Sequence, residues 1–144
     1  MAEVVLPQDA NPNGTAFGGK IVQWIDLCAG VAAGRHCRRP VVTASMDDLH
    51  FHAPIKIGYV ALLTAKITAV FRTSMEVSVR VMAENPLTGE RSLCTSAFLT
   101  FVGLGPDGRP AEVPPLIVET PEERDAFERA RERRAARLTR SAER

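Results

Sequence analysis

One carboxylate, Asp26, lies within the most apolar stretch of the chain, from Ile21 to Gly34. Burying an unpaired carboxylate costs roughly several kcal/mol, so the side chain must find a partner or face a cavity. Two roles fit these residue types. Asp26 is either a structural carboxylate, on a polar strip beside Gln23, or a general base. The sequence leaves both roles open.

A segment dense in turn-forming residues, Asp9 to Gly14, precedes this stretch. A turn that needs a positive φ explains Gly14 fully and Asn13 largely. Asn11 has two interpretations. Its side chain could close an Asx turn, or its carboxamide could point at a carbonyl group or a water molecule.

The tripeptide Phe17-Gly18-Gly19 leads directly into the apolar stretch. Two glycines would let a ligand approach the main chain, and the free N–H groups at a helix start would stabilise a developing oxyanion. A tight turn packed against another backbone is the structural alternative. A Gly-Gly pair alone does not decide between them.

A second polar group, Arg72-Thr73-Ser74, falls between two long apolar segments. An arginine, two hydroxyl groups and the N–H groups of a turn could together hold a phosphate. A solvated turn is the simpler alternative for these residues.

The histidines and cysteines do not form a familiar metal-binding pattern. His50 and His52 share a strand face, and His36 is followed by Cys37. The chain contains no Cys-x-x-Cys or His-x-x-x-His pair and no third ligand at a usual spacing. We therefore expect no metal. The Gly-x-Ser-x-Gly elbow of serine hydrolases and the glycine-rich phosphate loops are also missing.

The elements that must position these residues follow from hydrophobic periodicity. Apolar residues at helical spacing predict a buried helix of about four turns. They are Ile21, Trp24, Ile25, Cys28, Val31 and Ala32. Alternation and β-forming residues predict antiparallel strands around it. These cover residues 3–6, 41–51, 59–70, 74–84 and 91–104.

One buried helix and an antiparallel sheet make an α+β fold. Four or five strands cannot cover such a helix on every side, and open strand edges invite pairing. We therefore expect a homodimer that continues the sheet.

A polar helix is expected after this α+β domain, which we assign to residues 1–119. Thr120 followed by Pro121 and Glu123 is typical of a helix start. Residues 120–144 are mostly Arg, Glu and Ala, which predicts a solvated appendage or a partner-facing helix with a frayed end. The residues able to dock are Ala126, Phe127, Ala130 and Leu138.

Composition narrows the class of protein. The chain has 144 residues, is 45% hydrophobic and carries a net charge of +1. This predicts one globular domain and argues against a disordered chain, a membrane span or a nucleic-acid binder. The Arg-rich tail leaves an acidic partner or nucleic acid as a weaker alternative. Three sparse cysteines and no signal-peptide pattern favour a reduced, cytoplasmic setting.

Several segments together resemble the acyl-CoA thioester hydrolases of the hot-dog superfamily. The similarity extends from about Pro7 to Leu116. It includes Asp9 to Gly19, Trp24-Ile25-Asp26, Arg72 to Val77, Phe98 to Val102 and Val113-Pro114-Pro115. The segments are specific as a set rather than one by one.

This resemblance implies a hot-dog fold, in which the sheet wraps around the helix and two subunits build composite active sites. Trimers of such dimers are common in the family. It also implies hydrolysis of acyl-CoA to a free acid and CoA without metal or cofactor. Asp26 matches the family's general base or nucleophile, and Asn11 matches an asparagine contributed by the other subunit.

The remaining site residues follow from this mechanism. N–H groups near Gly18 and Gly19 would bind the thioester carbonyl, and Thr43 is a candidate for orienting the water. Contacts to the substrate are expected from Phe17, Gly18, Arg72, Thr73 and Ser74. The rival hypothesis is a non-catalytic module that binds acyl-CoA or lipid in the same pocket.

Overall fold

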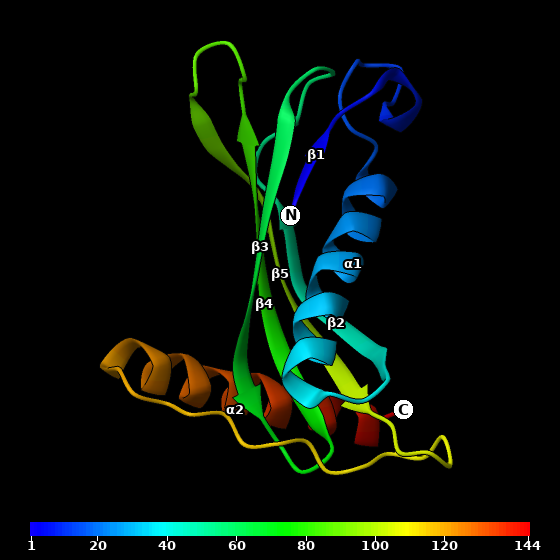
Figure 1. Cartoon of the computed structure of the whole chain (residues 1–144), viewed down its shortest axis with the longest axis vertical. Helices are drawn as coiled ribbons and strands as arrows, with labels where there is room; N and C mark the ends of the chain where they lie inside the picture. Colours follow the sequence, from blue (N-terminus) through cyan, green and yellow to red (C-terminus); the bar gives the residue numbers. More distant parts are fainter.

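A five-stranded antiparallel sheet curls around one long helix in the computed structural model, which describes residues 1–144 (Figure 1). The strand order is β1-β3-β4-β5-β2, and a second helix lies outside the sheet. The elements are β1 (Ala2–Val4), the 3₁₀ turn η1 (Pro7–Asp9), α1 (Gly18–Cys37), β2 (Val41–Phe51), β3 (Val60–Val70), β4 (Ser74–Glu84), β5 (Arg91–Gly103) and α2 (Pro121–Ala142). The predicted α+β architecture is confirmed.

Helix α1 is longer than the apolar periodicity predicts. It begins at Gly18, before the first periodic residue Ile21. It ends where Arg38 adopts a left-handed conformation, with φ of 55°, and donates its N–H to the carbonyl of Gly34. The first turn contains Gly18, Gly19 and a lysine, which carry no hydrophobic pattern, so periodicity alone could not find this end.

The core lies between α1 and the concave face of the sheet. Ala29 and Ala33 are fully buried on α1, and their small side chains allow the helix to approach the strands closely. The alternation predicted for β4 is confirmed, since every second residue is buried. These residues are Met75, Val77, Val79, Val81 and Ala83.

One chain leaves the other side of α1 open. Leu27 and Val31 are 54% and 56% exposed, although both lie on an apolar helix. The sequence argument that one sheet cannot surround this helix is therefore confirmed. An apolar helix face open to water is typical of a surface that another protein chain covers.

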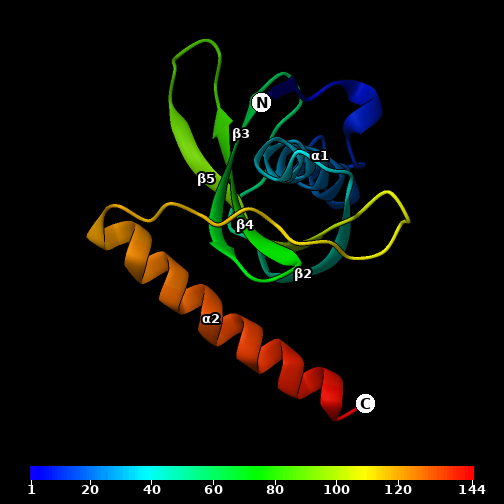
Figure 2. The same ribbon diagram turned by 60° about the horizontal axis from the view of Figure 1, so that its bottom comes forward.

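Helix α2 packs diagonally across the convex face of the sheet (Figure 2). The helix docks along one side, and most of its residues remain exposed to solvent. Thr120 caps the helix as predicted, accepting a hydrogen bond from the N–H of Glu123 at 3.1 Å. Ala130 is buried, whereas Leu138 stays half-exposed. Arginine side chains, rather than a continuous apolar stripe, make most of the contacts described next.

Arg133 forms the centre of the contact between α2 and the sheet. Its guanidinium donates to both carboxylate oxygens of Glu76 at 2.9 and 2.8 Å, and its carbon Cζ lies 3.6 Å from the ring centroid of Phe98. Glu76 also accepts a bond from the hydroxyl of Thr68. The pattern of β4 places Glu76 on the outer face, and α2 buries it there to 3% exposure.

Neither α1 nor α2 combines the length and the apolar character that a membrane-spanning helix needs.

Candidate active site

Asp26 has a polar partner in β2. The hydroxyl of Thr43 donates to Asp26 Oδ1 at 2.7 Å, and no protein hydrogen bond reaches Oδ2. Both side chains are exposed in the single chain, so the expectation of a buried carboxylate is not met. A carboxylate that is oriented through one oxygen and free at the other can accept a proton from a bound water.

A β-bulge in β2 brings Thr43 to this position. Thr43 pairs with Phe101 and Ser45 pairs with Thr100, so Ala44 is the extra residue. Side chains in a regular strand alternate, and the inserted residue reverses the phase. Thr43 therefore faces α1 on the concave side, while Ser45 faces the convex side.

Asn11 organises its own loop. Its Oδ1 accepts hydrogen bonds from the N–H groups of Asn13 at 2.9 Å and Thr15 at 3.2 Å. Its Nδ2 donates to the hydroxyl of Thr15 at 2.9 Å. These bonds are those of an Asx turn, the structural role considered for this residue. Within one chain, Asn11 makes no hydrogen bond to Asp26.

The start of α1 exposes main-chain donors as the sequence predicts. The N–H groups of Gly18 and Gly19 have no intrahelical acceptor, while those of Lys20 and Ile21 donate to the carbonyl of Phe17 at 2.9 and 3.2 Å. The Phe17 ring lies against Gly19, where an added Cβ would sit 2.8 Å from ring carbon Cε1. A side chain there would force the ring aside.

A hollow of about 360 Å³ opens beside this helix start. Phe51, at the end of β2, borders it and lies 3.7 Å from the position of a Cβ on Gly18. Phe17 and Phe51 are 59% and 51% exposed, so two aromatic rings flank the free N–H groups. Phe51 was not among the predicted site residues. Phe51 reaches the helix start because the end of β2 lies beside it, and only the tertiary fold reveals this arrangement.

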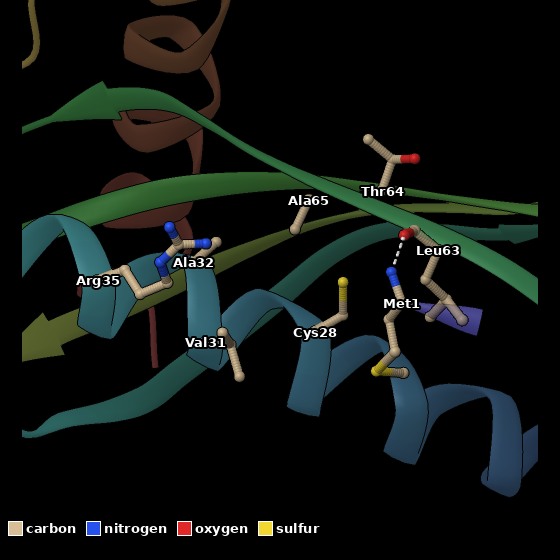
Figure 3. A pocket seen from close by; sticks show the side chains of 8 residues that line it. All are labelled: Met1, Cys28, Val31, Ala32, Arg35, Leu63, Thr64 and Ala65. Atoms are coloured by element: carbon tan, nitrogen blue, oxygen red, sulfur yellow. Dashed lines mark hydrogen bonds between the residues drawn. The ribbon is translucent and has the colours of Figure 1, made fainter. Parts of the chain in front are cut away.

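A larger groove of about 520 Å³ lies between α1 and β3 (Figure 3). Most of its lining is hydrophobic, and it comprises Met1, Cys28, Val31, Ala32, Arg35, Leu63, Thr64 and Ala65. Burial raises the pKa of the Cys28 thiol, which keeps it protonated. The groove is on the β3 side of the helix, whereas Asp26 bonds to β2, so the two are separate.

The predicted phosphate-binding residues lie at the β3–β4 turn, at the opposite end of the sheet from Gly18 (Figure 1). Main-chain bonds anchor this turn. The carbonyls of Arg72 and Thr73 accept from the N–H groups of Val113 and Gly103, each at 3.0 Å. The Arg72 side chain is exposed and forms no ion pair. Ser74 pairs with Val102, which pairs with Val42 beside Thr43, yet none of Arg72, Thr73 and Ser74 bonds to Asp26 within one chain.

The histidines serve local contacts. His52 Nε2 lies 3.2 Å from the hydroxyl of Ser96, and His36 Nε2 lies 2.8 Å from the carbonyl oxygen of Pro114. No group of three or more His, Cys, Asp or Glu side chains is arranged to hold a metal ion.

Sequence comparison identifies the family. Residues 13–90 match the model of the thioesterase superfamily. A protein of Bacillus subtilis (strain 168), named an uncharacterized acyl-CoA thioester hydrolase, is 46% identical over 134 residues, which cover 90% of this chain and 78% of the relative. The chain belongs to the acyl-CoA thioester hydrolases of the thioesterase superfamily. Some members are much longer. This chain spans 25% of the length of the mouse acetyl-coenzyme A thioesterase.

Solved structures confirm the hot-dog fold of this thioester hydrolase. An apo-hexameric acyl-CoA thioesterase is 42% identical, with a TM-score of 0.94 and coverage of 100% of this chain and 92% of that one. An acyl-CoA hydrolase of Staphylococcus aureus, 34% identical, has a TM-score of 0.91 and coverage of 99% and 87%. Its structure contains butyryl coenzyme A, coenzyme A and coenzyme A disulfide. Variants of it with one aspartate, asparagine or threonine replaced by alanine have also been solved.

Proposed function

We propose that this thioester hydrolase converts acyl-CoA and water to a carboxylic acid and CoA. The observation that carries the proposal is the exposed Asp26 carboxylate, oriented by Thr43 at 2.7 Å, in a chain of this family. A water adds to the thioester carbonyl, the C–S bond breaks, and the proton taken from the water returns to the CoA thiolate.

Asp26 is the general base in this proposal. Thr43 occupies Oδ1, and Oδ2 accepts the proton of the attacking water. Direct attack by Asp26, through an anhydride, is the alternative. Label found in Asp26 after a single turnover in ¹⁸O-labelled water identifies the anhydride route. Water attack labels only the product acid, whereas hydrolysis of the anhydride at the protein carboxyl places the label in Asp26.

The spacing of residues along α1 supports a site built from two chains. Gly19 and Asp26 are seven residues apart, so the helix rise separates them by about 10 Å along the axis. One carbonyl carbon cannot lie beside both the Gly18–Gly19 donors and the Asp26 carboxylate of the same chain. We therefore place Asn11, Gly18 and Gly19 of one subunit against Asp26 and Thr43 of its partner.

The free surfaces of the chain suit a homodimer. β2 has β5 on one side and no strand on the other, and α1 leaves Leu27 and Val31 open. Antiparallel pairing of two β2 strands would continue the sheet and cover the helices. The hexameric relative supports homo-oligomers, and we propose a trimer of such dimers as the higher assembly.

The relative from S. aureus supports both the substrate and the residues. Its ligands indicate a CoA thioester as substrate. The asparagine, aspartate and threonine replaced in it are separated along its chain by the same numbers of residues as Asn11, Asp26 and Thr43. Phe17, with Arg72, Thr73 and Ser74 of the β3–β4 turn, remains our proposal for contacts to CoA. No cofactor enters this reaction.

Thiol release from a panel of acyl-CoAs tests the proposal with Asp26→Asn and Asn11→Ala. We expect turnover to fall by about 10²- to 10⁴-fold in Asp26→Asn, the usual contribution of a positioned base. Wild-type turnover in Asp26→Asn would refute the role of Asp26. Saturable binding without turnover on any acyl-CoA, in the unmodified protein, would instead establish the non-catalytic module.

Subunit mixing tests the composite site. A mixed dimer of Asp26→Asn and Asn11→Ala chains contains one site with both residues intact and one with neither. We expect each variant alone to lose turnover, so activity should return when the two are unfolded and refolded together. Mixtures that remain as inactive as the separate variants would show that Asn11 and Asp26 act within one chain.

A further inference from the structure

Two arginines of α2 hold β2 from outside the sheet. Arg137 Nη1 lies 3.1 Å from Asp47 Oδ2, and Arg140 Nη2 lies 3.5 Å from Oδ1. Asp47 and Arg137 each have only 18% of the side chain exposed. Charge-assisted hydrogen bonds of this kind are stronger than neutral ones, and partial burial protects them from screening.

The segment they hold pairs irregularly with its neighbour β5. β2 is an edge strand, and its pairing with β5 shifts at Thr43/Ser45 and again at Asp47/His50. Between the shifts only three residues, 45–47, pair in register, and Asp48 adopts a positive φ of 50°. Two irregularities this close together leave little regular pairing with β5, and a slip of one residue moves each side chain to the other face.

The observed register determines where Thr43 points. Thr43 and Asp47 are four residues apart, so an unbroken strand would place them on the same face. The bulge at Ala44 instead places Thr43 beside Asp26 and Asp47 beneath α2. Ser45 Oγ is buried there without a hydrogen-bond partner, which disfavours this register. The bonds from α2 to Asp47 favour the observed register.

We propose that Arg137, assisted by Arg140, is a positioning residue that fixes the register of β2 and so directs Thr43 onto the Asp26 carboxylate. This inference rests on the proposed role of Asp26 and Thr43. The C-terminal helix then acts on the reaction through the strand, without touching the substrate.

A double-mutant cycle tests the coupling. Arg137→Gln should lower kcat about tenfold with little change in KM, within the roughly hundredfold loss that a displacement of about 1 Å can cause. In a Thr43→Val background the same change should have almost no further effect, because the hydroxyl it positions is gone. Arg137→Lys, which keeps the charge, should recover part of kcat.

Arg129→Gln is the matched control. Arg129 pairs only with Asp125 of α2, and both side chains are 60% exposed. The Arg129→Gln substitution removes an arginine of the same helix without altering a contact to β2, so kcat should not change. The inference is wrong if Arg129→Gln lowers kcat as much as Arg137→Gln does. It is also wrong if the fold losses in kcat caused by Arg137→Gln and Thr43→Val multiply in the double variant.

Amide hydrogen exchange gives a readout independent of turnover. Arg137→Gln should accelerate exchange over residues 42–47, and leave β4 protected. Unchanged exchange in β2 would overturn the inference even if activity fell. Measuring Asp26→Asn in parallel separates the two proposals. Loss of turnover in Asp26→Asn with full activity in Arg137→Gln removes only the positioning role.

Discussion

The two faces of the sheet hold their helices by different forces. On the concave face, α1 packs through fully buried apolar residues such as Ile25, Ala29 and Ala33. On the convex face, α2 is held through arginine–carboxylate pairs to Glu76 and Asp47, and Ala130 is the one buried residue of the helix. Hydrophobic burial is undirected, whereas bidentate arginine pairs require a defined geometry. The α1 face therefore contributes most of the folding stability, and the α2 face fixes the position of the strands that it contacts.

Truncating a residue of the concave core should have the largest effect. Leu99 is fully buried in this core, and Leu99→Ala should lower the free energy of unfolding by about 2–5 kcal/mol, through lost burial and the cavity left behind. Chemical denaturation followed by circular dichroism measures it. We expect a single transition for the whole chain. A loss below about 1 kcal/mol would contradict the assignment of stability to this face.

Breaking the Arg133–Glu76 pair should have a smaller and more local effect. Arg133→Ala leaves Glu76 buried without its cation, which costs up to about 3–5 kcal/mol where the structure cannot relax. Because α2 can undock and expose Glu76, we expect less than this in unfolding free energy and faster hydrogen exchange in α2. The double variant Glu76→Leu/Arg133→Leu should be nearer to wild type. A variant as unstable as Leu99→Ala, with no local change in α2, would remove the contrast between the faces.

Alkaline pH should change the unfolding free energy less than either substitution does. It should also affect the two faces of the sheet differently. Burial raises the pKa of the Cys94 thiol, so the unfolded chain releases this proton first and stability falls as pH rises beyond about 9. The hydrogen bonds to Glu76 raise the pKa of Arg133, so its guanidinium stays charged and this pair persists across the alkaline range in which the Cys94 thiol titrates. Between pH 8 and 10.5 unfolding free energy should fall while α2 stays docked.

Cys94→Ala provides the control for this pH dependence. Without the thiol, the fall in unfolding free energy above pH 9 should become shallower, because one buried acid no longer distinguishes the folded from the unfolded chain. Hydrogen exchange within α2, measured over the same pH range after correction for the intrinsic rate, reports its docking. Release of α2 before the core loses stability would reverse the expected order.

Hydrophobic periodicity predicted the structure correctly where one pattern covers a whole element. Alternation along β4 gave its buried face and both ends, because the strand has neighbours on both sides and the register shifts beside it insert their extra residues in β3 and β5. The sequence named Ala130 and Phe127 as docking residues, and both contact the sheet side, but it missed the arginines that make the other contacts of α2. These contacts come from arginines, whose aliphatic stems and planar guanidinium groups pack on phenylalanine rings and buried carboxylates. A count of apolar residues cannot register such contacts.

The sequence by itself determined the α+β class, the family, and the residue types of the candidate site: Asp26, Asn11 and the Gly18–Gly19 pair. These follow from local patterns that the chain carries whatever its neighbours do. Only the tertiary structure decided that Thr43, and not another strand residue, meets Asp26. The reason is the bulge at Ala44, which reverses the facing of every residue on one side of it. Its position depends on pairing with β5 and on the helix packed outside.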